Sequence, residues 1–359
     1  MSKRILFHTP QQLDNRDLDS GSSVRPAKML DAFENIGYDV DVVYGDTSER
    51  KQRLKKVKEN NATYEFCYSE PTTWPLNPFV DYPFYWYVRA SGIPLGVFYR
   101  DVYWQFPDLF DVSGLKWAEV QARYRIDLML LKRITSAMYV PSEPFGDFLG
   151  FGDQTTPLPP GGENNIQLRD TSKSIDRLIY VGSLSGRYGP ALLAKTATRL
   201  NEQKRVNVDV VCRKEDLEDL DSKQQFDREY IHIHHKSGDE LIPLYKQADA
   251  GIVTKRPTEY NNMAVSVKLY EYLSFGLPIV ITDGGVMASF VRENNCGVVC
   301  PPDSDDIADQ ILDLDNAETL RQIQDNCAET AKENTWDERA KTVADDLSGG
   351  GGELGTRQK

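Results

Sequence analysis

Short apolar runs alternate with longer amphipathic stretches in the first part of the chain. The segment between the first two runs, AKMLDAFENIG (27–37), carries its apolar residues at helical spacing and ends at Gly37, so we expect a helix there. Strands that alternate with helices are typical of a parallel, doubly wound sheet. The runs that we expect to be strands are 5–8 (ILFH), 39–44 (DVDVVY), 64–69 (YEFCYS), 95–100 (LGVFYR) and 137–141 (AMYVP).

A second series of the same kind follows a break. Residues 154–174, which include TTPLPPGGENN, cannot sustain a helix or a central strand, and we interpret them as a linker. Helical spacing returns at 189–202 and 239–249. The later runs that we expect to be strands are 177–183, 206–212, 230–235, 250–255, 277–283 and 296–301.

The two series predict an α/β protein with two Rossmann-like, parallel-sheet domains. A length of 359 residues fits two domains of ordinary size. We place the domains at 1–160 and 161–335, followed by a terminal helix at 336–347 and a flexible, glycine-rich tail at 348–359. Open parallel sheets bind ligands beyond the carboxyl ends of their strands, so two such sheets facing each other would form a cleft for two substrates.

The composition excludes some classes of function. The formal net charge of −13 argues against a general nucleic-acid binder. The five cysteines are scattered, as in proteins of a reducing compartment. No apolar run approaches the roughly 18 residues of a transmembrane helix. MSKRILFHTP enters a strand directly instead of forming a signal-peptide core, and we therefore expect a cytoplasmic protein.

The signals for metals and cofactors are weak. Cys296 and Cys300 lack a second cysteine pair, and His232, His234 and His235 alternate along a strand without a carboxylate at matching spacing. The loop after the first apolar run, DNRDLDSGSSVRP (14–26), is neither a GxGxxG motif nor a P-loop. We therefore expect no metal, NAD or ATP.

One helix carries a pair of charges among bulky residues. The segment SVKLYEYLSFGLPIVITDGG (266–285) predicts a helix, a Gly-Leu-Pro stop and a buried strand. Lys268 and Glu271 are i,i+3 neighbours on one face of this helix. The ordinary interpretation is a surface ion pair. However, the apolar neighbours leave little of the helix exposed, and a charged pair on a mostly buried helix must have a partner.

The N-terminus of this helix, at Ser266 and Val267, follows the strand at 250–255 and a polar loop in which Asn261 or Asn262 could provide the cap. It therefore lies at the edge where ligands bind. A carboxylate there can accept two hydrogen bonds from a ribose diol, while the ammonium group of Lys268 and the free N–H groups face a diphosphate. Such a site binds a nucleotide diphosphate without a metal.

The segment KLYEYLSFGLPIVITD resembles the donor-binding segment of GT-B fold glycosyltransferases of the group 1/4-like, nucleotide-sugar-dependent kind. The resemblance implies that Glu271 binds the ribose of a nucleotide sugar and that Lys268 lies near the phosphates. The segment LIYVGSLSGRYG (178–189) resembles the first strand and loop of the donor domain, which places Gly182 and Arg187 near the phosphates. The resemblance covers most of residues 178–347 and, more loosely, the N-terminal half.

The resemblance also implies roles for the domains. Residues 161–335 would bind the nucleotide sugar, residues 1–160 would bind the acceptor, and the helix at 336–347 would return to the N-terminal domain. Many retaining members carry a glutamate eight positions before the one that matches Glu271, where this chain has Met263. This departure favours inversion of the anomeric centre slightly over retention, and both stay open.

An inverting transfer requires a base that removes the proton of the acceptor hydroxyl. Asp101 follows the strand at 95–100, and the aromatic residues around it include Tyr103 and Trp104, which suit stacking on sugars. The alternative is that Asp101 caps a turn or helix and that the aromatic residues belong to the core. His8, at the end of the first strand, is either a second candidate base or a buried core histidine.

Two further segments have roles on the acceptor side. In GT-B enzymes the loop after the first strand commonly faces the acceptor and the donor phosphates, so the resemblance implies N–H contacts from Gly21, Ser22 and Ser23. Residues 114–141 combine basic and apolar side chains. Many GT-B enzymes use a basic amphipathic helix to reach lipid-linked acceptors at anionic membranes. The alternative is a packed helix with solvated charges.

These features predict a hexosyltransferase-type glycosyltransferase. It would move a sugar from a nucleotide diphosphate sugar to a glycan or lipid-linked acceptor, in the synthesis of a cell-surface polysaccharide or glycoconjugate. It would be cytoplasmic or peripheral at the inner face of the membrane, without cofactor or metal. Two alternatives stay open: a nucleotide-sugar epimerase of the same fold, and a non-catalytic module that binds nucleotide sugars.

Overall fold

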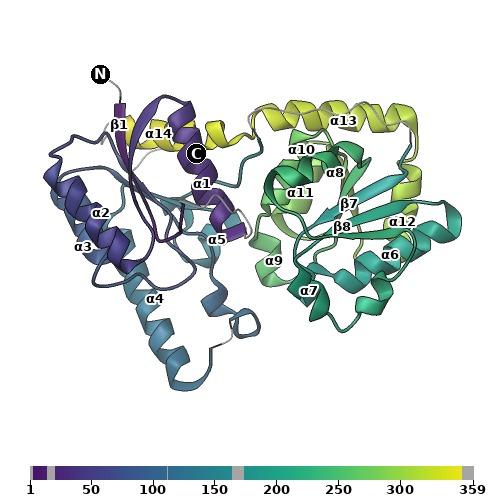
Figure 1. Ribbon diagram of the computed structural model, residues 1–359, viewed down its shortest axis with the longest axis horizontal. Coiled ribbons are helices and arrows are strands. Elements are labelled where there is room, and N and C mark those ends of the chain that lie inside the picture. Colours follow the sequence, from purple (N-terminus) through teal and green to yellow (C-terminus); the bar gives the residue numbers. More distant parts are fainter. Residues whose placement is uncertain (1–2, 14–20, 111, 164–173, 350–359) are drawn as a thin grey trace. The chain divides into compact units, whose positions relative to one another are not determined.

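The computed structural model describes residues 3–13, 21–110, 112–163 and 174–349 (Figure 1). The chain forms two compact units: an N-terminal unit of Met1–Pro159 with Trp336–Lys359, and a C-terminal unit of Pro160–Thr335. Within the described residues each unit holds a six-stranded sheet in which every strand pairing is parallel. The prediction of an α/β protein with two parallel sheets is confirmed.

The sheet of the N-terminal unit has the order β2-β1-β3-β4-β5-β6. Its first five strands are β1 (Lys3–Thr9), β2 (Tyr38–Tyr44), β3 (Cys67–Ser69), β4 (Leu95–Phe98) and β5 (Ala137–Val140). The last three lie within the predicted runs, whereas β1 and β2 begin before theirs and β1 also ends later. The sixth, β6 (Thr155–Pro157), lies in the segment that we interpreted as a linker, so that interpretation was wrong for these residues. Proline is tolerated there because β6 is an edge strand that pairs only with β5.

Helices surround this sheet. They are α1 (Gly21–Asn35), α2 (Thr47–Glu59), α3 (Asp81–Ala90), α4 (Gly114–Ile134), α5 (Glu143–Phe148) and α14 (Trp336–Ser348), with short 3-10 turns η1 (Tyr103–Gln105), η2 (Pro107–Leu109) and η3 (Gly152–Gln154). Helix α1 begins before the predicted residue 27. Helices α1 and α14 come from opposite ends of the chain and lie side by side (Figure 1). The last helix is therefore part of the N-terminal unit.

The sheet of the C-terminal unit has the order β12-β11-β10-β7-β8-β9. All six strands lie in the predicted runs: β7 (Arg177–Val181), β8 (Asn207–Val211), β9 (Ile231–His234), β10 (Ala250–Val253), β11 (Ile279–Thr282) and β12 (Gly297–Cys300). Its helices and turns are η4 (Gly186–Tyr188), α6 (Pro190–Gln203), α7 (Lys214–Glu218), η5 (Lys223–Phe226), η6 (Gly238–Leu241), α8 (Ile242–Gln247), α9 (Glu259–Met263), α10 (Val267–Ser274), α11 (Gly285–Glu293), α12 (Ser304–Asp313) and α13 (Ala317–Lys332).

Two apolar clusters, one on each face, hold this sheet between layers of helices. Helices α6 and α12 pack on one face, and α8, α10, α11 and α13 pack mainly on the other (Figure 1). The fully buried members include Leu200 of α6 and Tyr272 of α10. Burial of apolar surface at roughly 25 cal/mol per Å² is the main force that holds such layers together.

The strand order determines where each unit can bind a ligand. In the C-terminal sheet the chain runs from β7 outward to β9, returns to β10 beside β7, and continues outward to β12. The loops that follow β7 and β10 therefore leave the sheet at a point where the strand order reverses, and such a point leaves a crevice at the carboxyl edge. In the N-terminal sheet the same reversal lies between β1 and β3.

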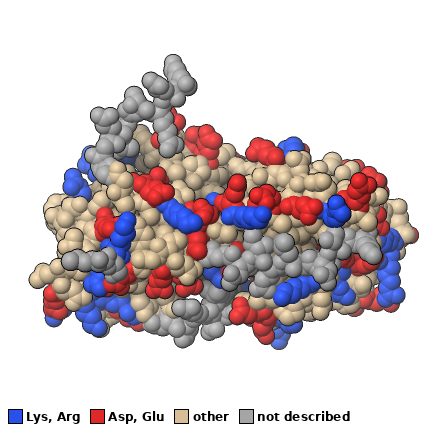
Figure 2. Space-filling model, turned by 90° about the horizontal axis from the view of Figure 1, so that it is seen from above, with Lys and Arg blue, Asp and Glu red and all other residues tan. Residues whose placement is uncertain are grey.

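The charges at the surface are mixed. Figure 2 shows one face of the molecule, on which acidic and basic side chains alternate without a continuous block of one sign. None of the described helices is both long enough and apolar enough to span a membrane.

Candidate functional site

The N-terminus of α10 lies at the carboxyl edge of the C-terminal sheet. Ser266 caps it, because its Oγ accepts a hydrogen bond from the backbone N of Lys268 at 3.3 Å. The predicted cap by Asn261 or Asn262 is wrong, since Asn261 belongs to α9. Its side-chain amide instead donates to two carbonyl oxygens, one of them that of Arg187 at 3.0 Å. Asn261 thus ties the loop after β7 to the loop after β10.

Lys268 and Glu271 form an ion pair on α10 that is held by a third residue. The Nζ of Lys268 lies 3.0 Å from Oε1 and 2.9 Å from Oε2 of Glu271. The hydroxyl of Tyr245, on α8, donates a further hydrogen bond to Oε2. The side chains of Lys268 and Glu271 are only 27% and 16% exposed. The carboxylate is therefore fixed in place, unlike that of an ordinary surface pair.

Tyr245 could not be found from the sequence, because it lies in a different helix from Glu271. Its ring is buried, and burial raises the pKa of its hydroxyl well above the usual value, so it stays a donor toward the carboxylate. A carboxylate with two oxygens has about four positions where it can accept a hydrogen bond. Three of these positions are occupied here, two by the ammonium group of Lys268 and one by the hydroxyl of Tyr245. Lys268 would free its two positions by turning toward a ligand.

The loop after β7 is packed tightly against the loop after β10. The hydroxyl of Thr254 donates to the carbonyl oxygen of Tyr188 at 3.0 Å. Gly189 has a left-handed φ of +65°, and a Cβ atom there would collide with the carbonyl oxygen of Thr254. This close approach requires glycine. It brings η4, and with it Arg187, to the end of β10.

Lys255, just beyond β10, was not identified from the sequence. Its Nζ lies 5.7 Å from the centre of the Tyr188 ring and 4.0 Å from Sδ of Met287. The guanidinium group of Arg187 lies 4.7 Å from the centre of the same ring. Burial, and then the positive charge of Arg187, lower the pKa of Lys255 to about 7. Two cationic side chains that both lie near the ring of Tyr188 and affect each other electrostatically form a site suited to an anion.

Met287 connects these cations with two helix N-termini. It lies in the first turn of α11, and its Sδ is 3.3 Å from the backbone N of Ser266. Val267 is the first residue of α10. The carboxyl edge thus gathers Arg187, Lys255 and the N-termini of α10 and α11, with the Lys268–Glu271 pair in the first two turns of α10. Helix N-termini and cations both favour bound anions.

Gly182 does not contribute an N–H group to this site. It follows β7, and its backbone N donates to the carbonyl oxygen of Val211 at 3.0 Å. That N–H extends the ladder between β7 and β8, so it is not available to a phosphate.

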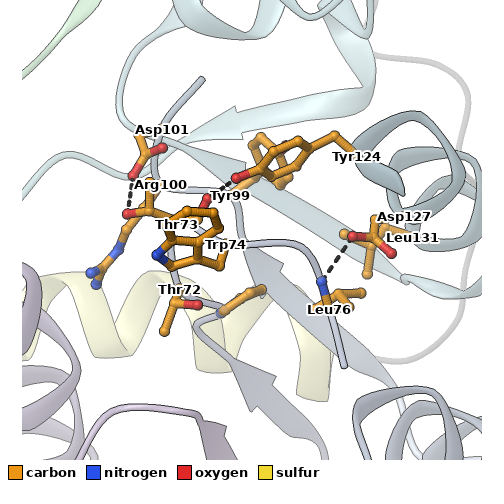
Figure 3. Close-up of a pocket in the computed structure, with 11 residues that line it drawn as sticks. Thr72, Thr73, Trp74, Leu76, Tyr99, Arg100, Asp101, Tyr124, Asp127 and Leu131 are labelled. Atoms are coloured by element: carbon orange, nitrogen blue, oxygen red, sulfur yellow. Dashed lines mark hydrogen bonds between the residues drawn. The ribbon is translucent and has the colours of Figure 1, made fainter. Parts of the chain in front are cut away.

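In the N-terminal unit, Asp101 lines a pocket beyond β4 (Figure 3). Its side chain is buried, and Oδ2 accepts a hydrogen bond from the hydroxyl of Thr73 at 2.8 Å. The N-cap residues of η1 and η2 are Val102 and Phe106, so Asp101 is not the N-cap of either turn. The pocket is lined by residues 71–74, 76, 99–101, 124, 127 and 131.

A second aspartate lies at the other end of this pocket. Asp127, on α4, accepts hydrogen bonds from the backbone N of Leu76 at 2.9 Å and from the hydroxyl of Tyr82 at 2.7 Å. Figure 3 shows Asp101 and Asp127 apart, with aromatic side chains between them. Burial raises the pKa of Asp127 above the usual value. Because it accepts the hydrogen bond from Leu76, Asp127 holds in place the loop that carries Thr73.

The aromatic residues near Asp101 differ in their exposure. Trp104 is buried, its Nε1 donates to the hydroxyl of Tyr99 at 3.1 Å, and its ring stacks on Tyr124 at 4.9 Å. We predicted that Trp104 stacks on a sugar, and this prediction is wrong, because its ring is buried against Tyr124. Tyr103 is partly buried in η1. Trp74, which we did not single out from the sequence, is 54% exposed and lines the pocket.

His8 lies in the core of the N-terminal unit. Its side chain has no exposure to solvent, its Nδ1 is 2.8 Å from Oγ of Ser69, and its Nε2 is 3.4 Å from Oδ1 of Asp81. Burial lowers the pKa of His8. Of the two alternatives for this residue, the structure shows the buried core histidine.

Gly21, Ser22 and Ser23 are the first residues of α1. The side chains of Ser22 and Ser23, like the preceding residues 14–20, lie outside the described part of the chain, so the predicted contacts remain predictions. Behind them, Glu70 is fully buried and accepts hydrogen bonds from Nε of Arg25 at 3.1 Å and from the hydroxyl of Tyr68 at 2.7 Å. This buried group fixes α1 to the end of β3.

The histidines of β9 pair with polar groups on β8. Nε2 of His234 lies 2.8 Å from Oδ1 of Asp209, and Nε2 of His232 lies 3.1 Å from Oδ1 of Asn207. The carboxylate of Asp209 comes from the adjacent strand, so spacing within the histidine segment gave no sign of this pair. Across the described residues, no group of three or more His, Cys, Asp or Glu side chains could hold a metal ion.

Residues 175–316 match the family model described as glycosyl transferases group 1. The matched segment includes Arg187, Lys255, Lys268 and Glu271. Among curated proteins, no sequence matches the chain.

Solved structures share the fold of nearly the whole chain. Alr3699/HepE of Anabaena in complex with UDP-glucose is 14% identical, with a TM-score of 0.67 over 96% of this chain and 99% of that one. WaaG, a glycosyltransferase involved in lipopolysaccharide biosynthesis, is 16% identical, with a TM-score of 0.62 over 96% and 100%. An α,α-trehalose-phosphate synthase (UDP-forming) from Burkholderia vietnamiensis is 12% identical, with a TM-score of 0.63 over 97% and 99%. The predicted GT-B fold is confirmed.

Proposed function

We propose that this protein transfers a sugar from a nucleotide diphosphate sugar to an acceptor, with the donor bound by the C-terminal unit. The observation that carries the proposal is the fixed carboxylate of Glu271 next to an anion site. Glu271 is held by Lys268 and Tyr245. Arg187 and Lys255 lie at the same carboxyl edge. A ribose diol and a diphosphate are the two groups that such a pair of sites recognises.

Each part of the site has a task in the transfer. Glu271 accepts hydrogen bonds from the two ribose hydroxyls, and Lys268 turns from Glu271 toward the phosphates. As the bond between the anomeric carbon and the diphosphate breaks, its electron pair moves to the diphosphate. The positive ends of α10 and α11, together with the two cations, stabilise this charge. These groups do the work that a metal ion does in other transferases, so the proposed transfer needs none.

We assign the acceptor side to the N-terminal unit, with Asp101 as the base. Asp101 would take the proton of the acceptor hydroxyl while that oxygen forms the new bond to the anomeric carbon. Thr73 positions the carboxylate by its hydrogen bond at 2.8 Å. The family's second glutamate is replaced by Met263, which is buried. We therefore favour inversion of the anomeric centre over retention.

The surface of α4 supports an acceptor at a membrane. Leu115, Ile126 and Met129 are 92%, 49% and 59% exposed, and they lie on one side of the helix. Arg125 and Lys132 are exposed beside them. An apolar stripe with basic neighbours suits the surface of an anionic bilayer. We propose that the protein is cytoplasmic, binds peripherally to the inner face of a membrane, and builds a cell-surface polysaccharide or glycoconjugate on a glycan or lipid-linked acceptor.

The experiment begins with a thermal-shift screen of nucleotide sugars, because a ligand that binds only the native state raises the melting temperature. The donor found in this way is then incubated with glycan and lipid-linked acceptors, and release of the nucleotide diphosphate is measured. Release that depends on the acceptor supports a transferase. Conversion of the donor sugar without acceptor indicates an epimerase, and binding without turnover indicates a non-catalytic module.

The role of Asp101 is tested with Asp101→Asn and the control Asp108→Asn, since Asp108 is exposed. Asp101→Asn should lower kcat by about 10²- to 10⁴-fold without changing donor affinity, as expected for loss of a general base. The control should keep its activity. NMR of the product shows whether the anomeric configuration is inverted, and a retained configuration would contradict the assignment of Asp101 as base.

A further inference from the structure

Lys255 has an environment that is costly for a cation. It is partly buried at the end of β10, and its contacts are the ring of Tyr188 and the sulfur of Met287. Among the described residues, Lys255 has no ion-pair partner within 4.0 Å, and no acidic group affects its pKa. The charge that lowers its pKa is that of Arg187, which has the same sign. A buried charge is normally compensated by an opposite one.

The elements packed around Lys255 do not supply the missing negative charge. Glu259, in α9, is exposed. Asp283, which precedes α11, accepts hydrogen bonds from the backbone N of Gly284 at 2.8 Å and from Arg292 at 3.2 Å. The other charged groups on these loops, Arg187 and Arg256, are cations. The N-terminus of α11 adds further positive potential.

The backbone around Lys255 is nevertheless firmly held. Its carbonyl oxygen accepts a hydrogen bond from the hydroxyl of Thr282, at the end of β11, at 2.5 Å. The backbone N of the next residue, Arg256, donates to the carbonyl oxygen of Arg187 at 3.2 Å. The two cationic residues thus belong to one hydrogen-bonded unit. They cannot relieve their repulsion by moving the backbone apart.

We propose that Lys255 and Arg187 together hold the diphosphate of the donor, and that Lys255 takes up a proton from solvent when the diphosphate binds. This inference rests on the proposed function. It adds a residue to the site and makes donor binding depend on pH. The diphosphate provides the negative charge that the surrounding elements lack, so the complex favours the ammonium form of Lys255 more strongly than the free protein does.

The sign of the pH dependence follows from the state of the free site. The pKa of Lys255 is lowered to about 7, so at pH 8 about nine-tenths of the free protein carries an unprotonated Lys255. If the bound diphosphate returns the pKa toward the usual value near 10, binding at pH 8 takes up about 0.9 proton. Affinity should then fall as the pH rises from 7.5 to 9.5, by up to about tenfold per unit.

The probe is UDP-glucose, with ADP-, GDP- and dTDP-glucose as further nucleotides, because the diphosphate group of these nucleotide sugars does not titrate in this pH range. Binding is measured by isothermal titration calorimetry at pH 8 in two buffers of different ionisation enthalpy, which gives the number of protons taken up. The variants are Lys255→Met, which removes the charge, and Lys255→Arg, which keeps it at every pH. The control is Lys246→Met, since Lys246 is exposed on α8.

The wild type and Lys246→Met should take up about 0.9 proton and lose affinity with rising pH. Lys255→Met should bind weakly and Lys255→Arg should bind well, both without proton uptake and with a flat pH profile. Circular dichroism confirms that each variant is folded. Binding of a nucleotide sugar without proton uptake, or proton uptake that persists in Lys255→Met, would overturn this inference alone. Failure to bind any of the four nucleotides would overturn the proposed function and this inference with it.

Discussion

Replacement of Glu271 by glutamine tests the most specific part of the donor site. The change keeps the size of the side chain but removes its charge and turns one acceptor oxygen into an NH₂ donor. The hydroxyl of Tyr245 can still donate to the remaining oxygen. One ribose hydroxyl then has no acceptor. The other ribose hydroxyl donates to a neutral amide oxygen instead of a charged carboxylate oxygen. Because Glu271 is only 16% exposed, water cannot fully replace the lost contact.

The magnitude follows from the kind of hydrogen bond that is lost. A hydrogen bond to a charged group contributes about 1.5–3 kcal/mol. At about 1.4 kcal/mol per tenfold change, Glu271→Gln should weaken the binding of UDP or another cognate nucleotide diphosphate by about 10- to 150-fold. The free energy of unfolding should change by less than about 1 kcal/mol, because the Lys268–Glu271 pair is partly exposed.

The assay is calorimetric titration with the ribonucleotide and with its 2′-deoxy and 3′-deoxy analogues. The wild type should bind the two deoxy analogues more weakly than the ribonucleotide. Glu271→Gln should show a much smaller difference in affinity between the ribonucleotide and the analogues. The control is Glu329→Gln, because Glu329 also forms an i,i+3 pair with a lysine, Lys332, but is 70% exposed on α13. The control should leave both affinity and discrimination unchanged.

The result that would refute the reasoning is equal discrimination by the wild type and Glu271→Gln. In that case Glu271 would not contact the ribose, whatever the loss in affinity. A large loss of stability in Glu271→Gln would also contradict the estimate, since it would mean that the pair supports the fold.

Two further predictions concern the partners of buried carboxylates. Tyr245→Phe removes one hydrogen bond to Glu271, so it should weaken nucleotide binding by about 2- to 12-fold in the same titration, with little change in kcat. An unchanged affinity would show that Tyr245 does not position Glu271. Glu70→Ala leaves Arg25 buried without a carboxylate and should lower the free energy of unfolding in urea by about 3–5 kcal/mol. The control Glu65→Ala, whose partner Lys3 is 62% exposed, should cost less than about 1 kcal/mol, and equal losses would refute the argument.

The fold could be predicted from the sequence because the buried strands of parallel sheets are continuous apolar runs. The runs at 177–183 and 250–255 contain β7 and β10, and the spacing of Met29, Phe33 and Ile36 indicated α1. The prediction missed β6 because TTP is short and contains proline, which an edge strand tolerates but which otherwise indicates a linker.

Residue spacing could predict the site only where its residues lie close together in sequence, and Arg187 was predicted from the resemblance of 178–189 instead. Lys268 and Glu271 are in one helix, and their spacing indicated that they share a face. Tyr245 and Lys255 reach the site from other elements, so only the fold brings them to it. The apolar composition around Asp101 did not distinguish the buried ring of Trp104 from the exposed ring of Trp74, because exposure depends on the packing of α4.

The most direct test of the donor site is a crystal structure of the protein with UDP-glucose, or with the nucleotide sugar that the screen identifies. Our account predicts that the ribose hydroxyls lie within hydrogen-bond distance of the carboxylate of Glu271. It also predicts that the diphosphate lies between Lys255, Arg187 and the N-termini of α10 and α11. A nucleotide bound elsewhere, with the Lys268–Glu271 pair unchanged, would contradict it.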